Sequence, residues 1–129
     1  MASEDDITRA VIGIAVAIHR ELGPGLLESA YHGILRDELR AQGFPVDSQR
    51  PVPVRFNGRV YEQGFRLDLL VDERVIIEVK SSERPAPVHA RQLLTYLRCL
   101  ELRVGLVVNL GMARAVDGIV RVVNHRCDS

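Results

Sequence analysis

Residues 65–80 read FRLDLLVDERVIIEVK, two apolar runs that flank the polar residues 72–74. Apolar strands joined by a short polar segment predict a β-hairpin. If the turn is centred on Glu73, Asp68 stands directly opposite Glu78 on the neighbouring strand. Opposed side chains of this kind have Cβ atoms about 4.5–5.5 Å apart. The hairpin therefore predicts two carboxyl groups side by side on one face of a sheet.

Lys80 is expected on the same face, because it follows Glu78 by two positions along the strand. It is the chain's only lysine, since every other one of the 17 basic residues is an arginine. This bias indicates that an ammonium group is needed there. A buried ion cluster or a solvated sheet face are the structural alternatives, although Leu70 and Ile76 point the same way as the charges. The opposite face is expected to supply the core through Leu67, Leu69, Ile77 and Val79.

Two carboxylates placed so closely repel each other unless something neutralises them. Mg²⁺ suits such a pair, because it takes oxygen ligands and keeps several waters. An ion of this kind can lower the pKa of a bound water and stabilise charge on a phosphoryl oxygen. A nearby ammonium can orient that water or offset the developing charge. Asp68, Glu78 and Lys80 are therefore the candidate centre for metal-dependent hydrolysis.

Apolar residues at helical spacing predict two helices before the hairpin, over residues 5–22 and 26–41. Asp5 or Asp6 is the expected cap of the first helix. Gly43 fits the end of the second. The inward side chains are expected to be Ile7, Val11, Ile14, Ala15, Ile18 and Leu22 in the first helix, and Leu27, Ala30, Tyr31, Ile34 and Leu35 in the second.

The remaining segments predict a mixed sheet. Residues 46–56 contain two prolines and are expected at a sheet edge. Asn57 and Gly58 predict a tight hairpin turn, and Gly64 a bulge in the strand that follows. The further strands are expected over residues 60–71, 75–80, 104–109 and 119–123, with a third helix over residues 88–100. The predicted class is α/β, a mixed β-sheet flanked by helices.

Composition limits the classes of function. The 129 residues suit one domain, residues 1–129, and no apolar run approaches the roughly 20 residues that span a bilayer. The acidic start lacks the basic segment of a secretory signal. Cys99 and Cys127 form no motif and are read as a reduced core thiol and a tail thiol. The expected location is therefore cytoplasmic. A net charge of zero weakens nucleic-acid binding as a hypothesis, unless charge is segregated by face.

Asp68 followed by Glu78, Val79 and Lys80 resembles the D…(D/E)-x-K signature of the PD-(D/E)XK nuclease superfamily. Residues 25–31, GLLESAY, match the pattern of the GxxExxY family within that superfamily. The resemblance covers about residues 7 to 123. It implies a PD-(D/E)XK nuclease-like core, dependence on Mg²⁺ or Mn²⁺, and DNA as the substrate.

Other residues are candidates for supporting roles. Glu28 could add a third carboxylate to the metal site, its alternative being a helix-surface charge. Tyr31 follows Glu28 by three positions and shares its helix face, so it could belong to the site. The alternative is that it is only a core tyrosine. Gln92 and Tyr96 resemble a Q-x-x-x-Y element that positions phosphate or water, the alternative being a polar helix edge. Two histidines carry weaker signals: His89 is expected at the surface, and His19 is expected to be a hydrogen-bonded core residue.

The favoured function is hydrolysis of a phosphodiester in nucleic acid by a metal-activated water. In this reading Asp68, Glu78 and Glu28 hold the metal, and the catalytic set is Asp68, Glu78, Lys80, Gln92 and Tyr96. The first alternative is a nuclease-fold module that binds nucleic acid or a protein partner without cutting. The second is a small structural homodimer. A positive rim around the site is expected from Arg50, Arg55, Arg59, Arg66, Arg84 and Arg91. The alternative is that these arginines pair with nearby acids on a solvated surface.

Overall fold

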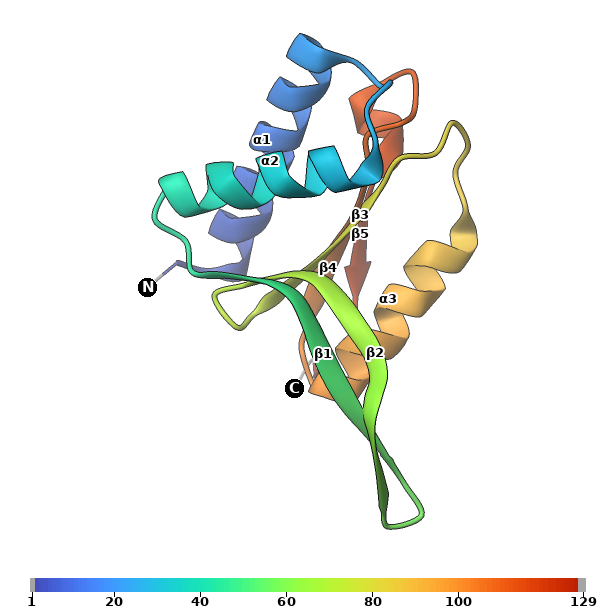
Figure 1. Cartoon of the computed structure of the whole chain (residues 1–129). Helices are drawn as coiled ribbons and strands as arrows, with labels where there is room; N and C mark the ends of the chain where they lie inside the picture. Colours follow the sequence, from blue (N-terminus) through green and yellow to red (C-terminus); the bar gives the residue numbers. More distant parts are fainter. Residues whose placement is uncertain (1, 128–129) are drawn as a thin grey trace.

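The structure, a computed structural model, describes residues 2–127 of the chain (Figure 1). Three helices and five strands follow one another as α1 (Glu4–Leu22), α2 (Glu28–Ala41), β1 (Val46–Phe56), β2 (Arg59–Val71), β3 (Val75–Lys80), α3 (Pro87–Leu100), β4 (Val104–Asn109) and β5 (Ile119–Val123). Short 3₁₀ helices cover Ala115–Gly118 and His125–Cys127. The segments expected from the sequence for β3, β4 and β5 coincide with the observed strands.

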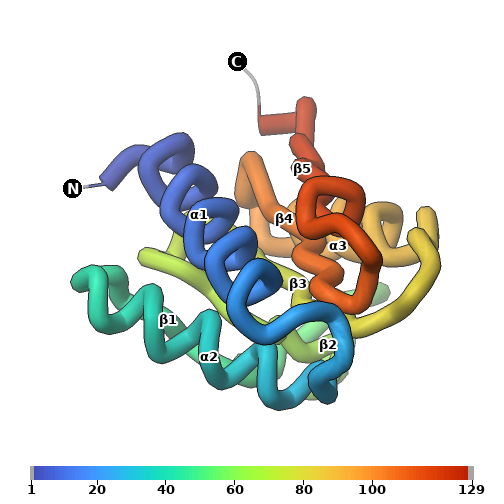
Figure 2. The backbone as a smooth tube through the Cα atoms, turned by 90° about the horizontal axis from the view of Figure 1, so that it is seen from above, coloured from blue at the N-terminus to red at the C-terminus, as the bar shows by residue number. Residues whose placement is uncertain are grey.

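The five strands form one sheet in the order β1-β2-β3-β4-β5. The β3–β4 pair is parallel and is connected by α3, while the other neighbours are antiparallel. Helices α1 and α2 cover one face of the sheet, and α3 covers the other (Figures 1 and 2). This confirms the α/β class and the mixed sheet flanked by helices.

Two apolar clusters hold the layers together. The larger one joins α1 and α2 to the sheet and includes Leu69, Ile77 and Val79, as expected. Leu67 was expected there too but packs in the cluster under α3. Gln49 of β1, between the pairs Ser48–Leu69 and Arg50–Leu67, has a φ of 59°. We attribute the change of face to this irregularity, which interrupts the regular alternation of the strand pair.

Helix ends differ in detail from the sequence prediction. Ser3, not Asp5 or Asp6, caps α1: its side chain accepts the Asp6 N–H, and the Asp6 carboxylate accepts the Ser3 N–H. This reciprocal capping satisfies two backbone donors. Helix α2 begins at Glu28, so Leu27 lies outside it and is 77% exposed. Leu22 at the end of α1 is also exposed, because the helix extends past the sheet core there.

The predicted turn and the predicted bulge of the β1–β2 region are both confirmed. Asn57 and Gly58 have φ of 50° and 76°, which a two-residue hairpin turn of type I′ requires. Strands β1 and β2 change register between Val52 and Val54, where residues 62–64 of β2 are accommodated. A Cβ on Gly64 would lie 2.1 Å from Val54 Cγ2, so the bulge depends on the absence of a side chain.

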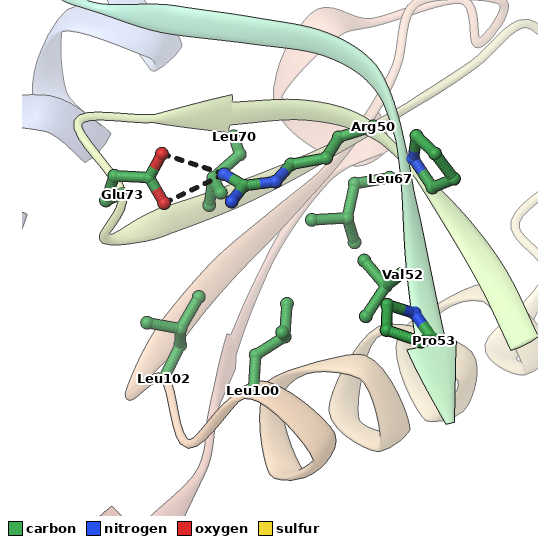
Figure 3. A pocket seen from close by; sticks show the side chains of 9 residues that line it. Arg50, Val52, Pro53, Leu67, Leu70, Glu73, Leu100 and Leu102 are labelled. Atoms are coloured by element: carbon green, nitrogen blue, oxygen red, sulfur yellow. Dashed lines mark hydrogen bonds and ion pairs between the residues drawn. The ribbon is translucent and has the colours of Figure 1, made fainter. Parts of the chain in front are cut away.

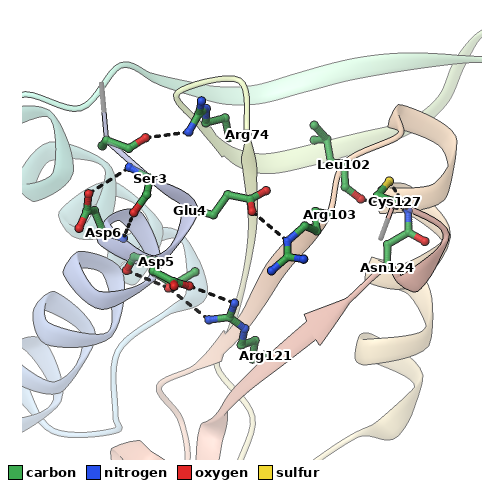
Figure 4. A network of polar contacts seen from close by, with 12 residues as sticks. Ser3, Glu4, Asp5, Asp6, Arg74, Leu102, Arg103, Arg121, Asn124 and Cys127 are labelled. Carbon is green, nitrogen blue, oxygen red and sulfur yellow. Dashed lines mark hydrogen bonds and ion pairs between the residues drawn. The ribbon is translucent and has the colours of Figure 1, made fainter. Parts of the chain in front are cut away.

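Polar contacts attach the start of α1 to the strands behind it (Figure 4). Glu4 pairs with Arg103 at 3.0 Å, and Asp5 pairs with Arg121 of β5 at 3.3 Å. Exposed ion pairs contribute little stability each. Their consequence here is to fix where the acidic first turn of the helix lies on the molecule.

Three smaller expectations are settled by the structure. His19 is half-buried, and its Nε2 lies 2.7 Å from the Met112 carbonyl oxygen, which confirms a hydrogen-bonded histidine. Cys99 and Cys127 are free thiols. Cys99 is exposed rather than in the core, because it lies on the outer side of α3. None of the helices among residues 2–127 is long and apolar enough to cross a membrane.

Candidate active site

Asp68 lies where the β2–β3 ladder ends. The register predicted from the turn is confirmed at Val71–Val75, Leu70–Ile76 and Leu69–Ile77. The predicted Asp68–Glu78 pair is not part of the ladder, which ends at Leu69–Ile77. Instead the Asp68 Oδ2 accepts the Val79 N–H at 2.8 Å. This bond holds the carboxylate against β3.

Glu78 is the most buried acid of the site, with only 5% of its surface exposed. Burial raises the pKa of its carboxyl to about 9, the adjacent Asp68 carboxylate adds to the rise, and Lys80 opposes it. Its Oε1 atom is buried without a hydrogen-bond partner among the described residues. A buried oxygen of this kind is unfavourable unless a donor or a cation reaches it.

Lys80 ends β3 next to Asn109 of the parallel strand β4. Its backbone carbonyl accepts the Leu110 N–H at 3.0 Å, which fixes the main chain. The ammonium Nζ lies 3.9 Å from Glu28 Oε1, and its side chain is 24% exposed. The single lysine is therefore partly buried, within the influence of Glu78, and in contact with a carboxylate of α2.

The residues of the GxxExxY pattern have distinct structural tasks. Tyr31 is fully buried, and its hydroxyl donates to the Gly23 carbonyl and accepts the Leu26 N–H at 3.1 Å. Ser81, just after Lys80, donates through Oγ to the Leu26 carbonyl at 2.8 Å. The turn before α2 is thus tied both to its own helix and to the end of β3. This connection brings Glu28 to Lys80.

Helix α3 contributes Tyr96 and His89 from the other side. The Tyr96 ring stacks on Phe65 of β2 with centroids 4.2 Å apart. Burial raises the pKa of Tyr96, and the charges of Glu78 and Asp68 add to the rise, which places its hydroxyl within their field. Burial lowers the pKa of His89, with Lys80 adding to the effect. Gln92, one turn before Tyr96, is exposed and makes no hydrogen bond that the described residues show.

A cleft of about 300 Å³ opens over Asp68. It lies between the start of α2 and the β1–β2 pair, and it is lined by Glu28, Ser29, His32, Gln49, Arg66, Asp68 and Val79. Asp68 therefore reaches open space, whereas Glu78 lies deeper. The cleft brings one arginine of the expected positive rim, Arg66, next to the carboxylates.

The donor set fits a hard divalent cation. Two carboxyl groups lie together, one of them carrying an unpaired oxygen, and neither is neutralised by a close ion pair in the described part of the chain. Residues 2–127 contain no group of three or more His, Cys, Asp or Glu side chains that could hold a metal ion. Mg²⁺ commonly binds through one or two carboxylates and fills its other positions with water and phosphate. Asp68 and Glu78 alone match that pattern.

Another cavity, of about 280 Å³, lies between the β1–β2 pair and the end of α3 (Figure 3). Arg50 lines it and binds both carboxylate oxygens of Glu73, another lining residue, at 2.7 and 2.8 Å. Arg50 also contacts Asp47 at 3.0 Å. It is therefore neutralised, and the expectation that it joins a positive rim around the site is wrong.

His32 was missed by sequence reasoning. It is 8% exposed, and its Nε2 lies 3.0 Å from the backbone oxygen of Asp68 and 3.2 Å from Ser48 Oγ. It thus fixes the main chain that carries the first carboxylate. A signal existed, because His32 follows Glu28 by four positions and so shares its side of the helix. Ser48 gave no signal, because its role depends on the pairing of β1 with β2.

The family model of the PD-(D/E)XK nuclease superfamily matches residues 5–122. No curated protein and no solved structure gives a significant match.

Proposed function

Because the chain belongs to the PD-(D/E)XK nuclease superfamily, whose members are generally divalent-metal-dependent nucleases, we propose that it hydrolyses phosphodiester bonds in DNA. The superfamily itself indicates nucleic acid and a divalent metal. We propose three details beyond this: the substrate is DNA, the ion is Mg²⁺ or Mn²⁺, and the chain belongs to the GxxExxY family. The match of Gly25, Glu28 and Tyr31 to the pattern supports the family placement, and two of these residues have contacts in the fold: Tyr31 bonds Leu26, and Glu28 contacts Lys80 of β3.

The observation that carries the proposal is the buried Glu78 oxygen that lacks a partner beside Asp68. A structural ion cluster would be expected to pair its buried oxygens, since leaving one unpaired costs about 1–3 kcal/mol. Here the nearest cation is Lys80, and the structure gives its ammonium a contact with Glu28 instead. Asp68 and Glu78 can therefore take a ligand from outside the chain.

We assign the residues as follows. Asp68 and Glu78 would hold the ion, which when bound supplies an activated water and a counter-charge for the phosphate. Lys80 would orient the attacking water. The expected third metal carboxylate, Glu28, does not join Asp68 and Glu78 in a three-ligand group within residues 2–127, and its contact is with Lys80 at 3.9 Å. We therefore propose that Glu28 keeps the Lys80 ammonium in position. Tyr96 lies within the field of the two carboxylates, and Gln92 is exposed one turn before it on α3. Both are proposed to position substrate phosphate.

A cleavage survey tests this function. Purified protein is incubated with single-stranded, duplex and branched DNA, and with single-stranded RNA, in the presence of Mg²⁺ or Mn²⁺. We expect DNA cleavage that a chelator stops and that the Asp68→Asn variant lacks. Metal-independent cleavage, or equal cleavage by Asp68→Asn, would show that a contaminating nuclease or another site is responsible.

A non-catalytic module is the second candidate. It is favoured by the zero net charge and by the lack of a third ligand among the described residues. Binding of DNA without cleavage of any substrate, with either metal, would select this alternative.

A further inference from the structure

The tips of β1 and β2, residues 53–64, form a hairpin that extends beyond the helices (Figure 1). We name this segment the arm, and we propose that it is a nucleic-acid-binding arm that stacks unpaired bases and contacts phosphates. The inference rests on the proposed nucleic-acid substrate, and it adds a binding surface separate from the metal centre.

One face of the arm combines two aromatic rings with an arginine. The cross-strand pairs are Val54–Tyr61, then Arg55–Val60, then Phe56–Arg59 at the turn. Because successive pairs point to opposite faces, the first and third pairs share a face. Phe56, Arg59 and Tyr61 therefore lie together, with Phe56 66% and Tyr61 51% exposed.

Neither ring belongs to the apolar clusters of the described residues. The other aromatic residues nearby, Phe65 and Tyr96, stack on each other closer to the sheet. A two-stranded hairpin without a packed face is only marginally stable by itself. Exposed aromatic side chains are the usual platform for bases of single strands, and arginine adds cation–π and phosphate contacts. The arm presents both.

The charge of the arm is complementary to phosphate. Arg55 and Arg59 are exposed and make no ion pair within residues 2–127, and the arm's single acid is Glu62. Arg50, lower on β1, is by contrast neutralised by Glu73 and Asp47. Like charge also disfavours the pairing of one arm with the arm of a second copy, so nucleic acid is the occupant we choose.

The arm and the cleft lie on one line. Strand β2 runs from Tyr61 through Arg66, which lines the cleft, to Asp68. At about 3.3 Å per strand residue, Tyr61 lies roughly 20 Å from Asp68 along the strand. A strand bound at the carboxylates would therefore have to continue for several nucleotides before it reached the arm.

Fluorescence anisotropy with labelled single-stranded DNA tests the arm, with Ca²⁺ in place of Mg²⁺ to suppress cleavage. The variants are Phe56→Ala/Tyr61→Ala and Arg59→Ala. Matched controls are Leu22→Ala, an exposed apolar residue of α1, and Arg20→Ala, an exposed arginine of the same helix. Probes of about 5 and about 20 nucleotides distinguish contacts at the cleft from contacts at the arm.

We expect the double variant to bind the long probe at least about tenfold more weakly, with the short probe unaffected. Arg59→Ala should lower the slope of log K against log salt by about 0.7. The controls should bind as the wild type does. Circular dichroism of every variant shows that the fold is kept.

Three results would overturn the inference: wild-type affinity of the double variant for the long probe, no binding of that probe by the wild type at low salt, or a change in oligomeric state on removing the rings. The third would make the arm a contact between copies. The proposed function is judged separately by cleavage. If an arm variant binds and cuts as the wild type does, the inference about the arm fails and the proposed nuclease function is kept. If the variant loses binding but the wild type never cuts, the proposed function fails and the inference about the arm is kept.

Discussion

Glu78 should make the stability of the metal-free protein depend on pH. Its pKa rises from 4.5 to about 9 on folding, so between these values the folded state keeps a proton that the unfolded state has lost. The free energy of unfolding must therefore fall as pH rises through this window, by at most about 1.4 kcal/mol per unit. Urea unfolding with chelator at about pH 6 and about pH 8 measures the difference.

The Glu78→Gln variant is the control, because it keeps the shape of the side chain and cannot ionise. We expect its stability to be nearly flat over the same window and to exceed that of the wild type at the upper end. A wild type without this loss of stability would mean that Glu78 is ionised in the folded protein.

Replacement of Lys80 by arginine should abolish cleavage although charge is kept. The guanidinium is larger, planar and effectively always protonated, so it cannot take the place of a compact ammonium between Glu78 and Glu28. We expect activity to fall by a hundredfold or more, in the range attributed to an acid–base or electrostatic group, with the fold kept. Arg98→Lys on the exposed side of α3 is the reciprocal control and should cut normally. Cleavage by Lys80→Arg near the wild-type rate would show that Lys80 supplies charge alone.

The three central residues could be predicted because their placement needs only one hairpin. The turn at Glu73 fixes the register, and the register fixes which side chains meet. The Asp68 bond to the Val79 N–H, the contact of Lys80 with Glu28, and the support from His32 could not be predicted in the same way. The first depends on how the ladder ends inside the hairpin, and the other two join segments far apart in the sequence. Local periodicity carries no information about either.

At the level of the elements, Tyr31 should matter more for positioning than for chemistry. Tyr31→Phe removes the hydroxyl that bonds the Gly23 carbonyl and the Leu26 N–H. Leaving those groups unpaired costs about 1–3 kcal/mol. We expect a lower melting temperature and weaker cleavage, because the turn that delivers Glu28 to Lys80 loosens.

Tyr61→Phe is the matched control for this hydroxyl, since Tyr61 is half exposed and its change should leave the melting temperature unaltered. If Tyr31→Phe melts like the wild type, the tyrosine serves only as apolar filling.

Strands were predicted more accurately than helix ends. The short apolar runs of β3, β4 and β5 are bounded by polar or turn residues, so their limits can be read directly. The cap of α1 was misassigned because three acids compete with Ser3, and only the geometry selects the serine. The side of Leu67 was misjudged because the left-handed Gln49 in the partner strand has no sequence signature.

On the scale of the whole molecule, a divalent metal should stabilise the fold. An ion that binds only the native state raises the free energy of unfolding by about 2.7 kcal/mol at a hundredfold excess over its Kd. The physical reason is that the ion compensates the charge of Asp68 and of the Glu78 carboxyl, which gives up its proton on binding. Thermal unfolding in Mg²⁺ or Mn²⁺ against chelator should show the rise for the wild type and little of it for Asp68→Asn. A rise of the same size in Asp68→Asn would place the ion elsewhere.

Titration calorimetry with Mn²⁺, in two buffers of different ionisation enthalpy near neutral pH, tests most directly whether Asp68 and Glu78 form a metal site. Because the pKa of Glu78 is about 9, its carboxyl is protonated before the ion binds and must lose that proton to become a ligand. We expect about one proton released for each ion bound, with both binding and release lost in Asp68→Asn. Absence of binding at millimolar Mn²⁺, or binding unchanged by Asp68→Asn, would contradict the assignment of these two carboxylates as the metal centre.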